Sequence, residues 1–346
     1  MKNLFTKLFV VSFMLVYGGS VWADGGVTPG TLSIEPNGEA YLDIFFNAGE
    51  VTDATGCSFL IYLPEGLTVD TENYKIGDVT TSNHIINVIY QTRNKRYKVG
   101  ITSNPKTQLA KTSGLLISVL IKANNTVAKG TVDGIKVVLS DIASESDGNV
   151  TTGINKEEQI VVAASGGAPV VINANGYATA CSAKALDFSA VEGVEAVFTV
   201  SKVADNTATL SPIESKQVPA EAGVVVKGTS GTVFVPFAEG SVAELGPNEL
   251  IGVTSAKSIA EGCYILQGEE FVSCIAGTLP AGKAYLPASV GSSSAKAFTF
   301  DFGESTGINE VKTAKADGAI YSISGVRVAE PQKGVYIMNG RKVIVK

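Results

Sequence analysis

Short segments in which apolar and polar residues alternate recur along most of the chain, and Gly, Asn and Pro separate them. This alternation predicts β-strands, because successive side chains of a strand point to opposite faces of its sheet. We find no helical period of apolar residues. In the first half of the chain, strands are expected at 31–35, 40–47, 56–63, 84–90, 97–102, 115–122, 135–142 and 159–162.

Two of these segments have a clearly one-sided apolar pattern. Leu42, Ile44 and Phe46 share one face of the first, and Phe59 and Ile61 share one face of the second. Two apolar sheet faces are stable when they pack against each other. With many short strands and Gly-rich turns, the pattern predicts a β-sandwich over residues 24–163.

The small residues of 164–169, Ala-Ser-Gly-Gly-Ala-Pro, are typical of a linker. A second β-rich domain is expected at 170–302, where Pro-Ala pairs precede short strands. Its strands are expected at 177–181, 194–200, 207–212, 223–227, 232–237, 263–266, 271–274, 284–287 and 297–301.

The C-terminal segment, 308–346, is expected to form a small β tail. It contains strands at 320–323 and 334–338, and a third strand at 342–346 follows Asn339-Gly340. Asn-Gly between alternating apolar residues is a strong hairpin signal. The chain is therefore predicted to be all-β.

The first domain resembles a family of known modules. The succession 59–64, 66–69, 113–118 and 135–141 is similar to a cohesin-type module and, more loosely, to carbohydrate-binding modules with the same jelly-roll sandwich. The resemblance implies a jelly-roll-like β-sandwich that binds a protein through one sheet face. The hairpin 84–102 would lie about where that face is built. A calcium-loop pattern around Gly148 fails, so a dockerin-like partner is expected on another molecule.

The tip of that hairpin is basic, although the chain as a whole is acidic. We take it as the candidate binding surface of the first domain, with a solvated loop as the alternative. The candidate residues are Tyr90, Arg93, Lys95, Arg96 and Lys98.

The second domain resembles accessory β domains of bacterial surface proteins, which implies a spacer or scaffold. The C-terminal segment resembles the sorting domain of type IX secretion cargo. The matching positions are Gly325, Lys333, Gly334 and Tyr336, followed by a basic strand. This resemblance implies recognition by a secretion machinery.

The first 23 residues are typical of a secretory signal peptide, with Lys2 and Lys7 before an apolar run and cleavage between Ala23 and Asp24. The run is too short to span a membrane, and no other transmembrane segment is expected. The predicted location is therefore secreted or on the outer cell surface.

The 346 residues carry a formal net charge of −6, which argues against nucleic acid as a partner. Among the four cysteines, Cys263 and Cys274 flank a possible turn at Gly268-Glu269, which would place them directly opposite each other. They are expected to form either a disulfide or a pair of reduced thiols. No metal site and no cofactor are predicted.

His84 is the one histidine and has no nucleophile motif beside it, so a non-enzymatic protein is expected. The leading function is adhesion or scaffolding through an extracellular protein or a glycan. A dedicated polysaccharide-binding module is the rival, although the one Trp, Trp22, falls in the signal peptide. A glycan hydrolase is the third possibility, because it needs only two carboxylates among residues such as Asp43 and Asp53.

Overall fold

The structure is a computed structural model, and it describes residues 25–152, 154, 156–291, 295–302, 320–322, 327–328, 333–338 and 341–345. The chain divides into two compact units between Asp301 and Phe302. The expected signal peptide, its cleavage site Ala23-Asp24 and Gly325 lie outside the described residues. Among the described residues, no helix is long and apolar enough to cross a membrane.

The first sandwich consists of two sheets. What we call the short sheet has the strand order β1 (Gly26–Pro29), β3 (Glu39–Asn47), β8 (Ser113–Ala123) and β5 (Leu67–Ile76). The long sheet has the order β2 (Leu32–Ile34), β11 (Gln159–Ser165), β9 (Gly130–Ser144), β4 (Ala54–Tyr62), β7 (Arg96–Ser103) and β6 (His84–Gln91), with β10 (Gly148–Val150) beside β9.

The core of this sandwich lies where the sequence predicts it. Leu42, Ile44 and Phe46 on β3 pack in one cluster with Phe59 and Ile61 on β4, and all five are at most 1% exposed. The burial of these five residues in one cluster confirms that the two sheets face each other, as the alternation predicts. Burial of one face of each strand also fixes the register of its pairing.

Residues 164–169 correct the predicted linker. The end of β11 and the start of β12 (Gly167–Ile172) occupy this segment, with Gly166 alone between the two strands. Gly166 has a φ of +70°, which turns the chain at low cost for a glycine. Its N–H donates to the Ile34 carbonyl and its carbonyl accepts from Phe237, so both sandwiches hold it.

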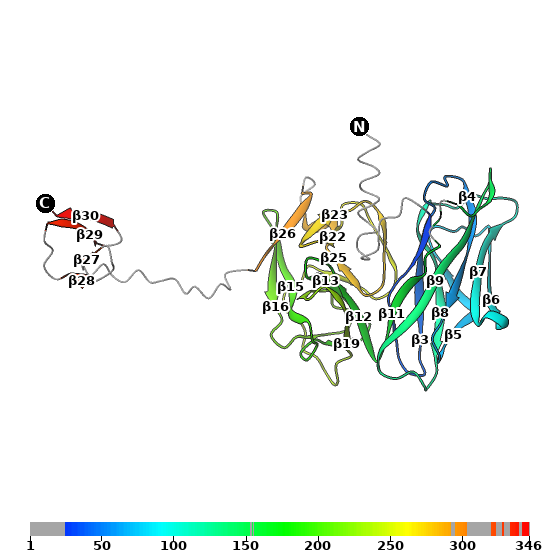
Figure 1. Ribbon diagram of the computed structural model, residues 1–346, viewed down its shortest axis with the longest axis horizontal. Helices are drawn as coiled ribbons and strands as arrows, with labels where there is room; N and C mark the ends of the chain where they lie inside the picture. Colours follow the sequence, from blue (N-terminus) through cyan, green and yellow to red (C-terminus); the bar gives the residue numbers. More distant parts are fainter. Residues whose placement is uncertain are drawn as a thin grey trace. The chain divides into compact units, whose positions relative to one another are not determined.

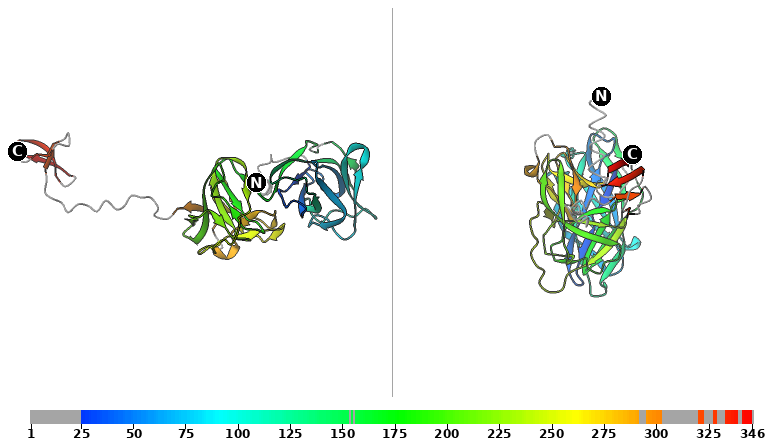
Figure 2. Two further views of the ribbon diagram at one scale, coloured as in Figure 1. Left: turned by 90° about the horizontal axis from the view of Figure 1, so that it is seen from below. Right: turned by 90° about the vertical axis from the view of Figure 1, so that its left-hand side faces the viewer.

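The second sandwich, drawn green to orange in Figures 1 and 2, follows directly after Gly166. Its main sheet has the order β13 (Tyr177–Ala180), β18 (Val224–Gly228), β15 (Val194–Ala204), β16 (Thr207–Pro212), β26 (Ala297–Asp301), β23 (Glu270–Ser273) and β22 (Tyr264–Gln267). Two-stranded sheets complete it: β12 with β19 (Gly231–Pro236), β14 (Leu186–Asp187) with β17 (Gln217–Val218), β20 (Ile251–Val253) with β25 (Lys283–Tyr285), and β21 (Lys257–Ile259) with β24 (Gly277–Leu279).

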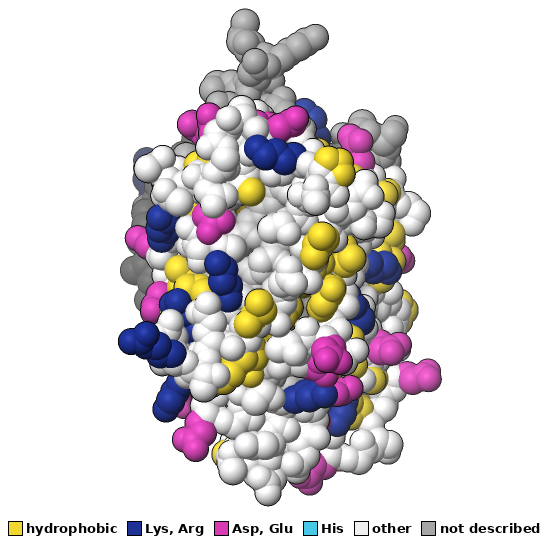
Figure 3. Space-filling view, turned by 90° about the vertical axis from the view of Figure 1, so that its right-hand side faces the viewer, with side chains coloured by type: hydrophobic (Ala, Val, Ile, Leu, Met, Phe, Trp, Pro, Cys, Tyr) yellow, Lys and Arg dark blue, Asp and Glu magenta, His cyan; other side chains and the backbone are white. Residues whose placement is uncertain are grey.

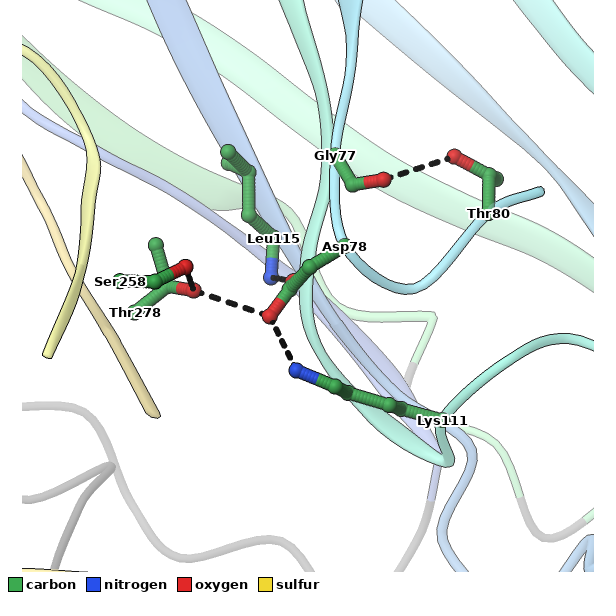
Figure 4. Close-up of polar contacts among 7 residues, drawn as sticks. All are labelled: Gly77, Asp78, Thr80, Lys111, Leu115, Ser258 and Thr278. Carbon is green, nitrogen blue, oxygen red and sulfur yellow. Dashed lines mark hydrogen bonds and ion pairs between the residues drawn. The ribbon is translucent and has the colours of Figure 1, made fainter. Parts of the chain in front are cut away.

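The second sandwich lies against the outer face of the short sheet, where β24 contacts β8. The Thr278 hydroxyl donates to Asp78 at 3.0 Å, and Asp78 also accepts from Lys111 and from the Leu115 N–H (Figure 4). Asp43, which points outward from β3, is only 6% exposed beneath this cover. The short sheet is therefore partly covered on its outer side.

The C-terminal unit is a small antiparallel sheet. Its strand order is β28 (Arg327–Val328), β27 (Ile320–Ser322), β29 (Gly334–Met338) and β30 (Arg341–Val345). Met338 pairs with Arg341, which confirms the expected hairpin register around residues 339 and 340. Gly334 and Tyr336 of the sorting-like motif lie on β29, and exposed Lys333 directly precedes it.

Candidate functional site

The outer face of the long sheet, at its β6 edge, is the main candidate. Along β6, His84, Ile86 and Val88 are buried, whereas Ile85 and Ile89 point outward and are 54% and 58% exposed. Figure 3 looks at this side of the molecule and shows hydrophobic side chains near the middle and Lys and Arg side chains toward one side. Large apolar side chains that face solvent together are characteristic of interaction surfaces.

Gly100 forms the floor between these isoleucines. The register pairs it with Asn87 of β6 and with Ser58 of β4. A Cβ at Gly100 would have no described heavy atom within 4 Å outside its chain neighbours, and its φ lies outside the left-handed region. A Cβ at the centre of the face would therefore meet open space, and the backbone there does not require a glycine.

Basic and aromatic side chains border this floor. Lys98 is exposed and pairs with Ile89 on one side and with Leu60 on the other. Arg96 donates from Nε to Gln91 Oε1 at 2.8 Å and from Nη1 to the Tyr62 hydroxyl at 2.9 Å. We call the surface made by Ile85, Asn87, Ile89, Lys98 and Gly100 the open face.

The structure separates the five predicted binding residues. Lys98 lies on the open face, and Arg96 lies beside it but is held by its hydrogen bonds. Arg93 and Lys95 are exposed at the hairpin tip, where Lys95 has a φ of +48°. Tyr90 points to the other side of the sheet, where its ring packs at a tilt against Tyr97 with 4.8 Å between the ring centroids. The predicted hairpin is therefore confirmed, but Tyr90 does not share a face with the lysine.

The basic residues at this end lack acidic partners. Within the described ranges, Arg93, Lys95 and Lys98 form no ion pair, whereas Lys136 at the far side of the sheet pairs with Glu158 at 2.7 Å. Exposed like charges repel one another and attract an acidic surface. This end of the open face is thus electrostatically suited to an acidic partner.

Sequence reasoning missed Ile85, Asn87, Ile89 and Gly100. The signal was present in His84–Gln91, because Ile85 and Ile89 alternate with the equally apolar Ile86 and Val88. An edge strand that is apolar on both faces indicates either a covered edge or a binding surface. The contribution of Gly100 depends on register, which the local pattern does not specify.

The carboxylates considered for hydrolysis lie apart. Asp43 faces outward from the short sheet, and Ser118 donates to it at 2.6 Å. Asp53 instead accepts from Ser144 and from Ser146 at the turn between β9 and β10. These hydrogen bonds lower the pKa of Asp53 to about 2. The described residues also contain no cluster of His, Cys, Asp and Glu suited to a metal.

The two cysteines considered for a disulfide lie opposite each other. β22 and β23 pair from Tyr264 with Ser273 to Gln267 with Glu270, as the turn at Gly268-Glu269 predicts. Cys274 N–H donates to the Cys263 carbonyl at 2.8 Å. Of the two alternatives, a disulfide or a pair of reduced thiols, the structure holds both cysteines as free, buried thiols.

Solved structures that are similar to the chain include cohesin domains. The seventh ScaB type I cohesin from Pseudobacteroides cellulosolvens is 16% identical, with a TM-score of 0.33 over 42% of this chain and 93% of that chain. A non-cellulosomal cohesin from the archaeon Archaeoglobus fulgidus is 14% identical, with a TM-score of 0.29 over 41% and 91%. No family model and no curated protein sequence matches the chain.

A cohesin crystallised with its dockerin shows the same degree of similarity. The type I cohesin–dockerin complex Coh-OlpA-Doc918 from Clostridium thermocellum contains a chain that is 11% identical, with a TM-score of 0.32 over 41% of this chain and 99% of that chain.

Proposed function

We propose that this chain is an exported, non-enzymatic recognition protein whose open face binds a partner protein with an apolar centre and an acidic rim. The observation that carries the proposal is the pair Ile85 and Ile89, each more than half exposed, on both sides of the open space above Gly100. Exposed apolar side chains that border an open space are typical of the centre of a protein–protein interface.

The chemistry of the open face favours a protein over a polysaccharide. Flat polysaccharide binding needs free aromatic rings on which sugar rings stack. Tyr62 lies at the border of the face, but its hydroxyl accepts from Arg96 and its ring lies 5.8 Å from that guanidinium. Tyr90 points to the other side of the sheet. The exposed surface that remains is aliphatic and basic.

The unpaired basic residues define the charge of the partner. Arg93, Lys95 and Lys98 lie at one end of the open face, on a chain whose formal net charge is −6. A local basic region on an acidic protein attracts an acidic patch while the rest of the surface repels it. Association should therefore slow as salt screens these charges.

Export and display complete the proposal. Residues 1–23 would direct the chain out of the cytoplasm, and the Lys333-Gly334 motif would be recognised by a secretion machinery. An extracellular partner is thus expected.

The test is a comparison of partner recovery by the full chain and by matched variants from the extracellular fraction of the source cells. Ile85→Asp and Ile89→Asp place a charge at the centre of the open face, whereas Ile275→Asp changes an exposed isoleucine of the second sandwich. Burying one isoleucine contributes about 1.5–3 kcal/mol, so each open-face variant should weaken binding by about tenfold or more.

The proposal is supported if at least one protein is recovered with the wild type and with Ile275→Asp but is not recovered with Ile85→Asp or with Ile89→Asp. If every recovered protein binds all four chains equally, or if recovery depends on a polysaccharide that carries the protein, the proposal is wrong.

A further inference from the structure

A cleft of about 590 Å³ lies between the outer face of the short sheet and the second sandwich. It is on the opposite side of the first sandwich from the open face, so the proposed partner does not account for it. Small-molecule sites in proteins are typically clefts of roughly 300–1,000 Å³, and they often lie between domains.

Asp43 lines this cleft as a buried acceptor. The residue is 6% exposed, and its carboxylate accepts from the Ser118 hydroxyl at 2.6 Å. Burial raises the pKa of this carboxyl above its ordinary value. A carboxylate has about four lone-pair sites, so the hydrogen bond from Ser118 leaves it able to accept from a ligand.

Each wall of the cleft carries a lysine beside an aromatic ring. Lys75 Nζ lies 3.9 Å from the centroid of the Tyr41 ring, on the side of the first sandwich. Lys184 Nζ, from the second sandwich, lies 5.2 Å from the Phe237 ring centroid and 2.5 Å from Glu35 Oε1. Positive donors, carboxylates and aromatic rings therefore all line this one cleft.

This combination of groups determines the kind of ligand that fits. An anion would be repelled by Asp43, and a cation would be repelled by Lys75 and Lys184. A hydroxyl group both donates and accepts, so neighbouring hydroxyls of one ligand can donate to the Asp43 carboxylate and accept from Lys75.

We propose that the cleft between the two sandwiches binds a neutral, polyhydroxylated ligand of saccharide size. The site is separate from the open face and does not depend on the proposed protein partner.

The experiment is an NMR titration of the isotopically labelled full chain with glucose, galactose, mannose, N-acetylglucosamine, cellobiose and lactose. At least one sugar should cause saturable shifts of the amides at 254–256 and 281–282, which line the cleft. Amides of β6 and β7 should not shift. Lys75→Met should weaken binding about tenfold, because a charged hydrogen bond is lost.

Two controls separate this site from the open face. Lys98→Met removes an exposed lysine outside the cleft and should leave the affinity for the sugar unchanged. Gly100→Trp, which fills the open face, should also leave it unchanged. The proposal is overturned if no sugar of the panel causes saturable shifts at millimolar concentration, if the shifts map to β6 and β7, or if Lys75→Met binds as tightly as the wild type.

Discussion

Thr278 donates a 3.0 Å hydrogen bond to Asp78, although 200 residues separate the two along the chain. The bond joins the second sandwich to the loop after β5 in the first (Figure 4). Because the second sandwich partly covers the outer face of the short sheet in this way, the outer face of the long sheet is on the side away from this contact. The location of the open face thus follows from the packing of the two sandwiches.

Replacing Thr278 by valine should remove this hydrogen bond with little change of shape. Asp78 keeps Lys111 and the Leu115 N–H as donors, so its carboxylate does not become unpaired. We expect a loss of about 1 kcal/mol in the free energy of unfolding, measured by urea denaturation of the full chain. Thr68→Val, at an exposed position of β5, is the matched control, and an equal effect of both changes would contradict this role.

Arg96 and Arg93 should behave differently although both are basic residues of one hairpin. Arg96→Ala removes two hydrogen bonds, to Gln91 and to Tyr62, so it should lower the free energy of unfolding by about 1–2 kcal/mol. Arg93→Ala, at the exposed tip, should leave stability unchanged and should instead reduce the association rate with an acidic partner at low salt. Denaturation and stopped-flow binding measure the two effects, and a stability loss confined to Arg93→Ala would refute this assignment.

Lys283 should make the stability of the second sandwich depend on alkaline pH. Burial lowers the pKa of this lysine from its usual 10.5 to about 8, so between these values the unfolded chain binds more protons than the folded chain. The contribution of Lys283 to stability therefore rises as the pH increases from about 8 to 10.5, by roughly 3 kcal/mol.

The difference in unfolding free energy between wild type and Lys283→Met isolates this contribution. Lys283→Met should be the more stable chain at pH 7, and its advantage should shrink as the pH is raised. Lys98→Met replaces an exposed lysine, so its unfolding free energy should show the same pH dependence as that of the wild type across this range. A difference that stays constant with pH would show that the amine is not buried as described.

Cys263 and Cys274 should be the pair that oxidises if the exported chain forms a disulfide. They lie opposite each other in one hydrophobic cluster, whereas Cys57 lies in the core of the first sandwich. Burial raises the pKa of Cys274 to about 12, so the native thiol should react slowly with alkylating reagents. Peptide mapping after refolding with oxidised glutathione should find the 263–274 bridge, and a bridge to Cys57 would contradict the hairpin.

Much of the fold is readable from the sequence because burial of one strand face leaves a local signature. Leu42 and Ile44 lie on either side of Asp43 in β3, and Phe59 follows Ser58 in β4. The burial of these three apolar residues confirms the prediction. β5 has no such signature, since Asp70–Lys75 is mostly polar and exposed. Its position comes from pairing with β8 and from the ion pair of Asp70 with Lys122 at 2.7 Å.

The candidate site could be predicted from the sequence only where its residues are close together along the chain. The basic tip, Arg93 and Lys95, is visible as a run of charge in the sequence. The open space above Gly100 is not, because it requires Gly100 to lie between Asn87 and Ser58, and these three residues lie on three different strands. The exposure of the face also depends on the second sandwich, which packs on the opposite side.

The most direct test of the open face as a recognition surface is to fill its floor. Gly100→Trp places a large side chain into open space on a backbone that accepts it, and Gly246→Trp does the same at an exposed position of the second sandwich. We would measure the affinity of a partner that passes the isoleucine comparison for both variants. Binding lost with Gly100→Trp and kept with Gly246→Trp, at equal stability, is the predicted result; equal binding by the two variants would contradict the assignment of this face.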